Sequence, residues 1–322
     1  MVEEVVPNLY RIEVPLPGSP LKSVNSYVFK SKERNLIVDT GLNREECRQA
    51  MEAGLREVGV ELKETDFFIT HLHADHFGLV SRLVKDSRKI YFNRPEKEII
   101  EAWGGWEPMV QYARRIGFPE ELLRAALNAH PGFKYGSQWV PKLSVLQDGE
   151  TIRAGDYILR CVATPGHTRG HMCLYEPTKK FFLAGDHMLR DITPNIQCWS
   201  DQDDPLKDYL ASLDKVDGLE VDLVLPGHRI LFKDFHVRIR ELKAHHQRRA
   251  DEVLEILEEG PKDAFEVASR MTWDIDYASW EDFPVAQKWF ATGEAISHLR
   301  YLEGRELVGR RDQGETVAFH LV

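Results

Sequence analysis

The sequence predicts an α/β fold in which short apolar strands end in loops that carry metal-ligating side chains. The apolar run 67–69 is followed at once by Thr-His-Leu-His-Ala-Asp-His, residues 70–76. Three later apolar runs pass through Gly or Pro to a single ligand type, at His167, Asp186 and His228. Gly and Pro let the backbone turn sharply, which leaves the next polar side chain at the edge of a sheet.

The N-terminal part of the chain is expected to contain strands around amphipathic helices. Residues 44–58 place four apolar side chains on one helical face: Cys47, Met51, Leu55 and Val58. Apolar runs on either side predict strands. In chain order we expect opening strands over 5–29, a strand at 36–39, the helix 44–58, a second helix at 78–85 and a strand at 90–93.

The second half of the chain begins with strands and ends with helices. Strand-like runs cover 157–163, 181–186 and 221–228, and a helix is expected over 205–216, with Pro near its first turn. Helices then follow over 236–259, 264–271 and 284–303, and the tail predicts a hairpin of residues 307–311 and 316–321. Helices followed by a short hairpin suggest a winged-helix-like module.

The cluster at 70–76 has the composition of a metal site. Alternate side chains of an extended segment point the same way, so His71 and His73 can converge on one ion. Asp75 and His76 face elsewhere and can serve a second ion, because imidazole nitrogen and carboxylate oxygen suit a borderline cation such as zinc. The spacing differs from the helical His-Glu-x-x-His pattern, which predicts another fold. A solvated or core-packed group of histidines is the alternative interpretation.

These motifs resemble those of the metallo-β-lactamase superfamily, over about residues 5–235. The resemblance also takes in Val38-Asp39-Thr40-Gly41 before the first helix. It implies an αββα sandwich of two sheets flanked by helices, with the metals in a cleft at one edge. It further implies that one ion is held by His71, His73 and His167, a second by Asp75, His76 and His228, and that Asp186 bridges them.

The same resemblance implies a reaction mechanism and two divalent ions per chain, with zinc expected and iron or manganese as alternatives. A hydroxide held between such ions is a nucleophile at neutral pH, because the cations lower the pKa of bound water to about 7. Asp75 is then the catalytic residue, which orients the hydroxide and accepts a proton. Asp39 is expected to hold a ligating histidine, and His171 either does the same or has a structural role.

The length of the chain predicts two domains, residues 1–235 and residues 236–322. The interval between His76 and His167 exceeds what a minimal sandwich needs, which predicts a helical insertion at about 96–141. Three tryptophans are expected to contact substrate, because aromatic surfaces that exclude water line ligand sites: Trp103 and Trp106 in the insertion and Trp199 after Asp186. An insertion packed only on its own aromatic residues is the alternative.

Composition excludes several classes of protein. The chain is 43% hydrophobic and 29% charged, as in ordinary globular proteins. No apolar run approaches the roughly twenty residues of a membrane helix, and the acidic start lacks a signal-peptide pattern, so the cytoplasm is the predicted compartment. Four cysteines without Cys-x-x-Cys pairing indicate reduced thiols. The net charge of −10 disfavours polyanions, although bound cations can make a cleft locally positive.

The expected reaction is hydrolysis of a small-molecule thioester or lactone, since the aromatic insertion suits an apolar acyl group. The resemblance extends to glyoxalase II-like proteins, but no clear cluster of Lys, Arg and Tyr for glutathione is present. Cleavage of single-stranded RNA is the second interpretation, because residues 294–303 resemble a helix of a lactamase-like endoribonuclease with a C-terminal winged-helix-like module. Against it, residues 236–322 contain twelve Lys and Arg but seventeen Asp and Glu.

A non-enzymatic role is the remaining interpretation, in which a regulatory or nucleic-acid-binding protein keeps a vestigial site. The complete ligand set argues against it. The sequence leaves the oligomeric state open and is compatible with a homo-oligomer.

Overall fold

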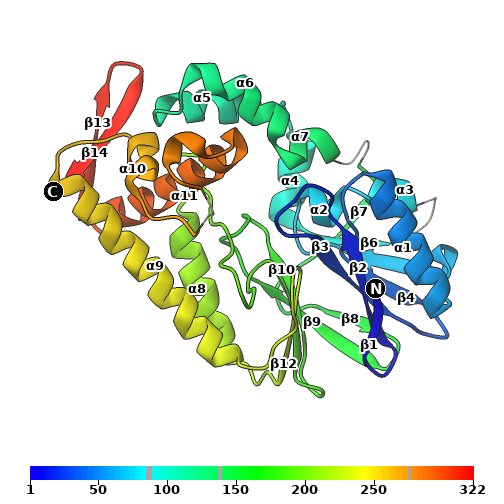
Figure 1. Ribbon diagram of the computed structural model, residues 1–322. Coiled ribbons are helices and arrows are strands. Elements are labelled where there is room, and N and C mark those ends of the chain that lie inside the picture. The colour runs from blue at the N-terminus through cyan, green and yellow to red at the C-terminus, as the bar shows by residue number, and fades with distance from the viewer. Residues whose placement is uncertain (85–88, 137–139, 275–276) are drawn as a thin grey trace.

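Two β-sheets lie between layers of helices (Figure 1). This computed structural model describes residues 1–84, 89–136, 140–274 and 277–322. The first sheet has the order β1-β2-β3-β4-β5-β6-β7 and the second the order β12-β11-β10-β9-β8. The first sheet comprises β1 (Val2–Val6), β2 (Leu9–Pro15), β3 (Ser23–Phe29), β4 (Asn35–Val38), β5 (Thr65–Phe68), β6 (Ile90–Asn93) and β7 (Leu143–Leu146). The second comprises β8 (Thr151–Ala154), β9 (Tyr157–Ala163), β10 (Met172–Glu176), β11 (Phe181–Gly185) and β12 (Leu223–Pro226).

Strand direction brings the predicted ligand loops to one edge of both sheets. In the first sheet β4 and β5 pair in parallel, so the segments after them, at Asp39 and at residues 70–76, leave from the same edge. In the second sheet β11 and β12 pair in parallel, which places Asp186 and His228 together. The two edges meet, because Met172 N–H donates to the Thr70 carbonyl at 2.9 Å.

Three apolar layers hold the sandwich together. Between the sheets, Phe29 and Phe68 of the first pack in one cluster with Leu174 and Phe181 of the second. A second cluster lies between the first sheet and α1 (Glu45–Val58), and a third between the second sheet and α8 (Pro205–Asp217) with α9 (Phe235–Glu258). The buried strands therefore have apolar side chains on both faces, which explains their nearly continuous apolar sequences.

Helix α1 illustrates why the sequence pattern was informative. It begins with the acidic Glu45 and Glu46 and has the basic Arg56 in its last turn. Charges in these positions interact favourably with the helix dipole and stabilise the helix. Its C-cap is Gly59 in the left-handed conformation, with φ of 74°. The four residues of the predicted apolar face are all buried: Cys47, Met51, Leu55 and Val58.

The predicted insertion and the C-terminal segment share a core. The insertion forms α4 (Arg94–Glu101), α5 (Glu107–Arg115), α6 (Glu120–Ala129) and α7 (Pro131–Tyr135). After α9 the chain forms α10 (Ala264–Arg270), α11 (Val285–Glu303) and the hairpin β13 (Val308–Gln313) with β14 (Thr316–Leu321). Trp289 of α11 is buried among Val110, Phe118 and Leu123 of the insertion. The insertion therefore packs on the C-terminal helix as well as on itself.

The structure confirms the predicted fold class and corrects several element boundaries. The helix expected over 78–85 is replaced by the short helices α2 (Ala74–Phe77) and α3 (Val80–Leu83), and Lys85 lies outside the described residues. Strands β7, β8 and β10 were not predicted from the sequence. The hairpin turn is tighter than expected, since β13 continues to Gln313. The domain boundary at 235/236 stays a prediction.

Candidate metal centre

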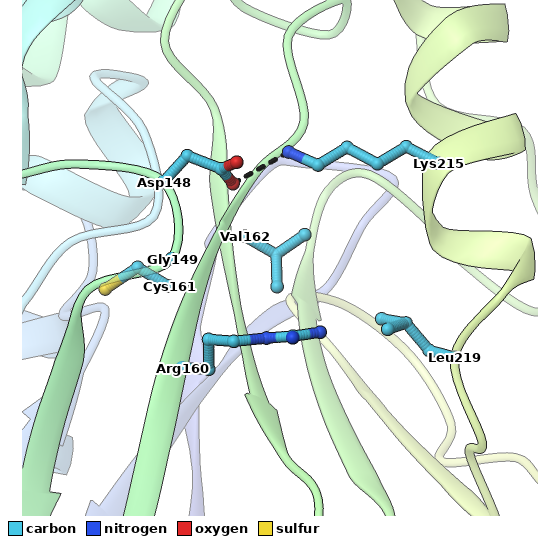
Figure 2. A pocket seen from close by; sticks show the side chains of 7 residues that line it. All are labelled: Asp148, Gly149, Arg160, Cys161, Val162, Lys215 and Leu219. Atoms are coloured by element: carbon cyan, nitrogen blue, oxygen red, sulfur yellow. Dashed lines mark hydrogen bonds and ion pairs between the residues drawn. The ribbon is translucent and has the colours of Figure 1, made fainter.

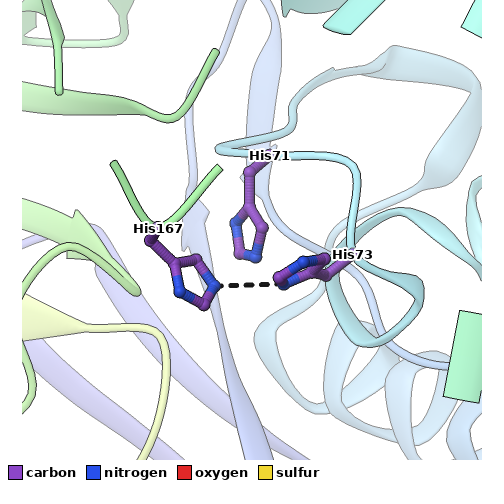
Figure 3. Close-up of side chains that lie close together, drawn as sticks. All are labelled: His71, His73 and His167. Atoms are coloured by element: carbon purple, nitrogen blue, oxygen red, sulfur yellow. Dashed lines mark hydrogen bonds between the residues drawn. The ribbon is translucent and has the colours of Figure 1, made fainter. Parts of the chain in front are cut away.

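Three imidazole rings from two loops point toward one another at the shared edge of the sheets (Figure 3). His71 and His73 follow β5, and His167 lies between β9 and β10. His167 Nε2 is 3.0 Å from His73 Nδ1, and the His71 ring centroid is 4.6 Å from that of His73 and 4.9 Å from that of His167. Each ring offers a nitrogen within 4.8 Å of the others, so the three rings form a group that could hold one cation.

A second group lies beside the first. Its members are Asp75, His76 and His228, whose ligand atoms also lie within 4.8 Å of one another. His228 Nε2 is 3.3 Å from His76 Nε2 and 3.4 Å from Asp75 Oδ2. His76 and His228 are buried, whereas the Asp75 side chain keeps 19% of its surface exposed. This second group can therefore be reached from solvent on the side of Asp75.

Asp186 stands between the two groups. Its Oδ1 is 3.5 Å from His76 Nε2, and its Oδ2 is 3.3 Å from His228 Nε2 and 3.7 Å from His167 Nε2. One carboxylate thus faces nitrogens of both groups, a geometry compatible with the bridging role that the resemblance implies for Asp186.

Hydrogen bonds from the ring nitrogens that point away from the cluster determine which nitrogens remain available to bind an ion. A carbonyl oxygen only accepts, so His167 Nδ1–H donates to Asn195 O at 2.9 Å and His228 Nδ1–H donates to Ser23 O at 2.7 Å. His76 Nδ1–H likewise donates to the Asp39 carboxylate at 2.8 Å. In neutral rings the Nε2 atoms that turn inward then carry lone pairs rather than protons.

The donor set fits divalent cations. The lone pairs of His76 Nε2 and His228 Nε2 face each other at 3.3 Å, an arrangement that repels unless a proton or a cation lies between them. Within the described residues, His71 Nε2 and Asp186 Oδ1 are buried without a hydrogen-bond partner. Buried polar atoms are normally paired, and these two lie within the clustered groups, so they are available to a bound cation. Imidazoles and carboxylates in this ratio suit zinc, iron or manganese.

Asp39 orients two of the predicted ligands at once. Its Oδ1 accepts from the Thr70 backbone N–H and its Oδ2 from Thr70 Oγ1–H, both at 2.8 Å. Thr70 Oγ1 in turn accepts from His71 Nδ1–H at 2.9 Å, while Oδ2 also accepts from His76. The Asp39 backbone has φ of 59°, which turns the chain sharply after β4. This geometry is compatible with the role that the resemblance implies for Asp39.

His171 contacts the backbone of Asp186. Its Nδ1–H donates to Thr164 Oγ1 at 2.8 Å, and its Nε2 accepts from the Asp186 backbone N–H at 3.1 Å. With one nitrogen committed to each bond, His171 has no nitrogen left for an ion. It therefore lies where it can position Asp186.

Burial and the neighbouring charges shift the pKa values of the cluster in opposite directions. Burial lowers the pKa of His71 well below its usual value, and His76 nearby lowers it further. Burial also acts to lower the pKa of His228, but Asp186 and Asp75 outweigh it and raise that pKa to about 10. Without an ion, His228 is therefore protonated at neutral pH.

Metal loading near pH 7 should release a proton, because His228 must become neutral before it can bind an ion. His76 carries a second such proton, because burial, which acts to lower its pKa, is outweighed by Asp186 and Asp39, which raise that pKa well above the usual value. As the pH rises through about 10, the metal-free His228 loses its proton on its own, so the release should fall. Calorimetry in buffers with different ionisation enthalpies measures the release directly. Proton release that stays constant from neutral pH to above pH 10 would contradict this prediction.

The three predicted substrate tryptophans lie in two places. Trp106 packs edge-on against Trp103, with ring centroids 5.2 Å apart, and against His130 at 4.9 Å. Trp103 is half exposed at 51%. Trp199 stacks on Trp289 of α11 at 4.2 Å. These contacts are internal to the insertion or join the 190–199 loop to α11, so substrate contact stays a prediction for all three.

A small cavity of about 150 Å³ lies away from this centre, between β9 and α8 (Figure 2). It is lined by Asp148, Arg160, Val162 and Lys215 among others. Two of its charges pair, since Lys215 Nζ donates to Asp148 at 2.7 Å and to the Ala163 carbonyl at 2.8 Å. This cavity contains none of the predicted site residues.

Some residues that shape the centre were not identified from the sequence. The backbone carbonyls of Ser23 and Asn195 carry no signal in residue type. Glu96 of α4 is a buried carboxylate that accepts from Thr168 and from the Gly170 N–H, beside His167. Burial raises the pKa of Glu96 to about 7, although these hydrogen bonds act to lower it. A single Glu near the start of a helix is common in sequences, so its residue type did not predict the contact of Glu96 with Thr168 and Gly170.

Comparisons with known proteins agree on the family. A family model described as the metallo-beta-lactamase superfamily matches residues 20–228. The chain is 26% identical over 332 residues to the probable metallo-hydrolase YqjP of Bacillus subtilis, covering 96% of each chain. It is also 26% identical over 254 residues to the atrochrysone carboxyl ACP thioesterase of Aspergillus fumigatus, covering 79% of this chain and 66% of that one.

Among solved structures, the chain resembles the metallo-beta-lactamase family protein TTHA1429 of Thermus thermophilus. The TM-score is 0.85 at 29% identity, and the match covers 99% of this chain and 100% of that one. The similarity therefore includes the insertion and the C-terminal segment. None of the described helices combines the length and apolar character needed to cross a membrane.

Proposed function

This chain belongs to the metallo-beta-lactamase superfamily, and we propose that it is a dinuclear metal hydrolase that cleaves a thioester or lactone of a small molecule. The ligands would be His71, His73 and His167 for one ion, Asp75, His76 and His228 for the other, and Asp186 for both. Zinc is the expected metal, with iron or manganese as alternatives. The observation that carries the proposal is the convergence of these seven side chains from four loops.

The residues of the chain have distinct roles in this proposal. Two divalent ions, when bound, would act as Lewis acids and lower the pKa of water. Asp75 is the more exposed carboxylate, at 19% against 9% for Asp186, so its Oδ2 is the better placed to orient water and take its proton. Asp39 and His171 keep their neighbours in place, because hydrogen bonds to a ligand set its tautomer and its direction.

The thioester is proposed because of the relatives and the charge of the chain. The relative from Aspergillus fumigatus is named a thioesterase, and the YqjP relative a metallo-hydrolase. The chain has 42 Lys and Arg against 52 Asp and Glu, which does not favour a polyanion such as RNA. We also propose a cytoplasmic location and assign residues 236–322 to a C-terminal helical, winged-helix-like domain.

Asp75→Ala should lower kcat for thioester hydrolysis by about 10²- to 10⁴-fold, the usual contribution of a positioned proton acceptor. The assay is a panel of acyl thioesters, lactones and short RNA oligomers, run on the metal-loaded protein and on protein stripped with a chelator. We expect thioester or lactone turnover that the chelator abolishes and added metal restores.

The same panel tests the competing interpretation. Turnover of RNA alone would reverse the assignment and make the protein a phosphodiesterase. Turnover that survives both the chelator and Asp75→Ala would exclude the proposed site altogether. Asp203→Ala is a suitable control, because this carboxylate pairs with Arg169 at the surface rather than with the cluster.

A further inference from the structure

The C-terminal helix α11 is connected to His167 through a single residue of the loop that follows Asp186. His167 Nδ1–H donates to the backbone carbonyl of Asn195 at 2.9 Å. The side chain of Asn195 donates from Nδ2 to Glu294 Oε2 of α11 at 3.3 Å. Glu294 Oε1 lies 3.6 Å from Arg249 Nε of α9. A chain of contacts thus runs from the C-terminal segment to a predicted metal ligand.

We propose that Glu294 is a positioning residue for the metal centre. By holding the Asn195 side chain, it fixes the backbone carbonyl that sets the direction and the tautomer of His167. The inference rests on the proposed function, since it gives Glu294 a role only if His167 binds an ion. The C-terminal segment, which contains none of the proposed ligands, would then help to position one of them.

The rest of this loop is also anchored on the C-terminal helices. Arg238 of α9 donates to the Leu189 carbonyl at 2.7 Å and to the Ile192 carbonyl at 2.8 Å. Cys198 N–H donates to the Gly293 carbonyl of α11 at 3.0 Å. Asn195 lies between these two anchors, and its side chain is held by the bond to Glu294. The loop is therefore built on the C-terminal segment rather than on the sandwich alone.

The burial of the Glu294 carboxyl group is consistent with a positioning role. Its side chain is 11% exposed, and a buried carboxylate is unfavourable unless it is paired. Burial raises the pKa of Glu294 to about 7, although Arg249 acts to lower it. At neutral pH the group is thus partly neutral, so the oxygen that accepts from Asn195 matters more than the full negative charge. Glutamine, which keeps such an oxygen, should preserve the contact.

Glu252 offers a matched control. It also pairs with Arg249, with Glu252 Oε2 at 2.8 Å from Arg249 Nη1, but its partners are Arg249 and the Thr272 N–H rather than Asn195. A carboxylate that served only as a counterion for Arg249 would therefore be equivalent to Glu252. If Glu294 instead positions Asn195, its substitution should affect metal binding more than substitution of Glu252.

The experiment measures the dissociation constant for Zn²⁺ by competition with a fluorescent chelator, together with the melting temperature of each metal-free protein. We expect Glu294→Leu to weaken the tighter site about tenfold, the lower end of the effect of an outer hydrogen bond on metal affinity. Glu294→Gln and Glu252→Leu should stay within about threefold of the parent. Asn195→Ala, which leaves the α11 core intact, should weaken binding as Glu294→Leu does, and the double variant should show no additional loss.

Two results would overturn the inference while leaving the proposed function in place. One is two ions bound with unchanged affinity by both Glu294→Leu and Asn195→Ala. The other is an equal loss of affinity in Glu252→Leu and Glu294→Leu, which would make Arg249 pairing the relevant contact. If the parent protein bound no metal at all, the proposed function and the inference would fail together.

Discussion

Asp186→Ala is expected to reduce hydrolysis by about 10⁴-fold, since two separate effects of about 10² each are lost when both ions lose a ligand. Its two oxygens lie 3.3 to 3.7 Å from His76, His228 and His167, so both groups depend on this one side chain. The protein should also bind at most one ion instead of two. Metal content by mass spectrometry and kcat/KM for the best substrate of the panel give the two readouts.

The control for this variant lies five positions along the same loop. Asp191 is exposed and pairs at 3.9 Å with Arg229, so Asp191→Ala should keep both ions and full turnover. Two ions retained by Asp186→Ala would show that this carboxylate does not bridge them.

Asp39→Asn is expected to keep the fold and to lower turnover by about 10³-fold or more, because it forces the wrong histidine tautomer. Asparagine tolerates the left-handed backbone at this position, and its amide oxygen can still accept from the Thr70 N–H. The amide nitrogen, however, would face His76 Nδ1 at 2.8 Å, where a proton now lies. His76 would then carry its proton on Nε2, the nitrogen that faces the ions.

Nitrogen-15 NMR of the histidine side chains reads the tautomer of His76 directly, in parallel with kcat/KM. Asp66→Asn is the matched control, since this buried carboxylate of β5 accepts from the Lys89 N–H and pairs with Arg34, away from the ligands. Asp39→Asn with unchanged turnover and an Nδ1-protonated His76 would contradict the role assigned to Asp39.

The convergence of the ligands could be predicted from the sequence because their positions follow from strand order. Each predicted ligand follows an apolar strand, and parallel pairing of β4 with β5 and of β11 with β12 brings these ends to one edge. The alternation of side chains in an extended segment likewise explains why His71 and His73 face one group. Local rules predict where the strands end and that His71 and His73 point the same way, whereas the grouping of the seven side chains around two ions came from the resemblance to the metallo-β-lactamase superfamily.

The outer contacts could not be predicted, because they depend on tertiary packing. The carbonyls of Ser23 and Asn195 are present in every peptide unit, and only the folded chain places them beside His228 and His167. Glu294 lies 99 positions from Asn195 on a helix that the sequence described only as a C-terminal module. The packing of Trp289 on the insertion was hidden for the same reason, since residues far apart in the chain form one core.

Anomalous diffraction from crystals of the metal-loaded protein, recorded at the absorption edge of the bound metal, tests most directly whether seven side chains hold two ions. The predicted result is two peaks per chain, one among His71, His73 and His167 and one among Asp75, His76 and His228, with Asp186 in contact with both. A map without a peak at this edge of the sheets, or with an ion bound elsewhere while these side chains stay free, would contradict the proposed metal centre.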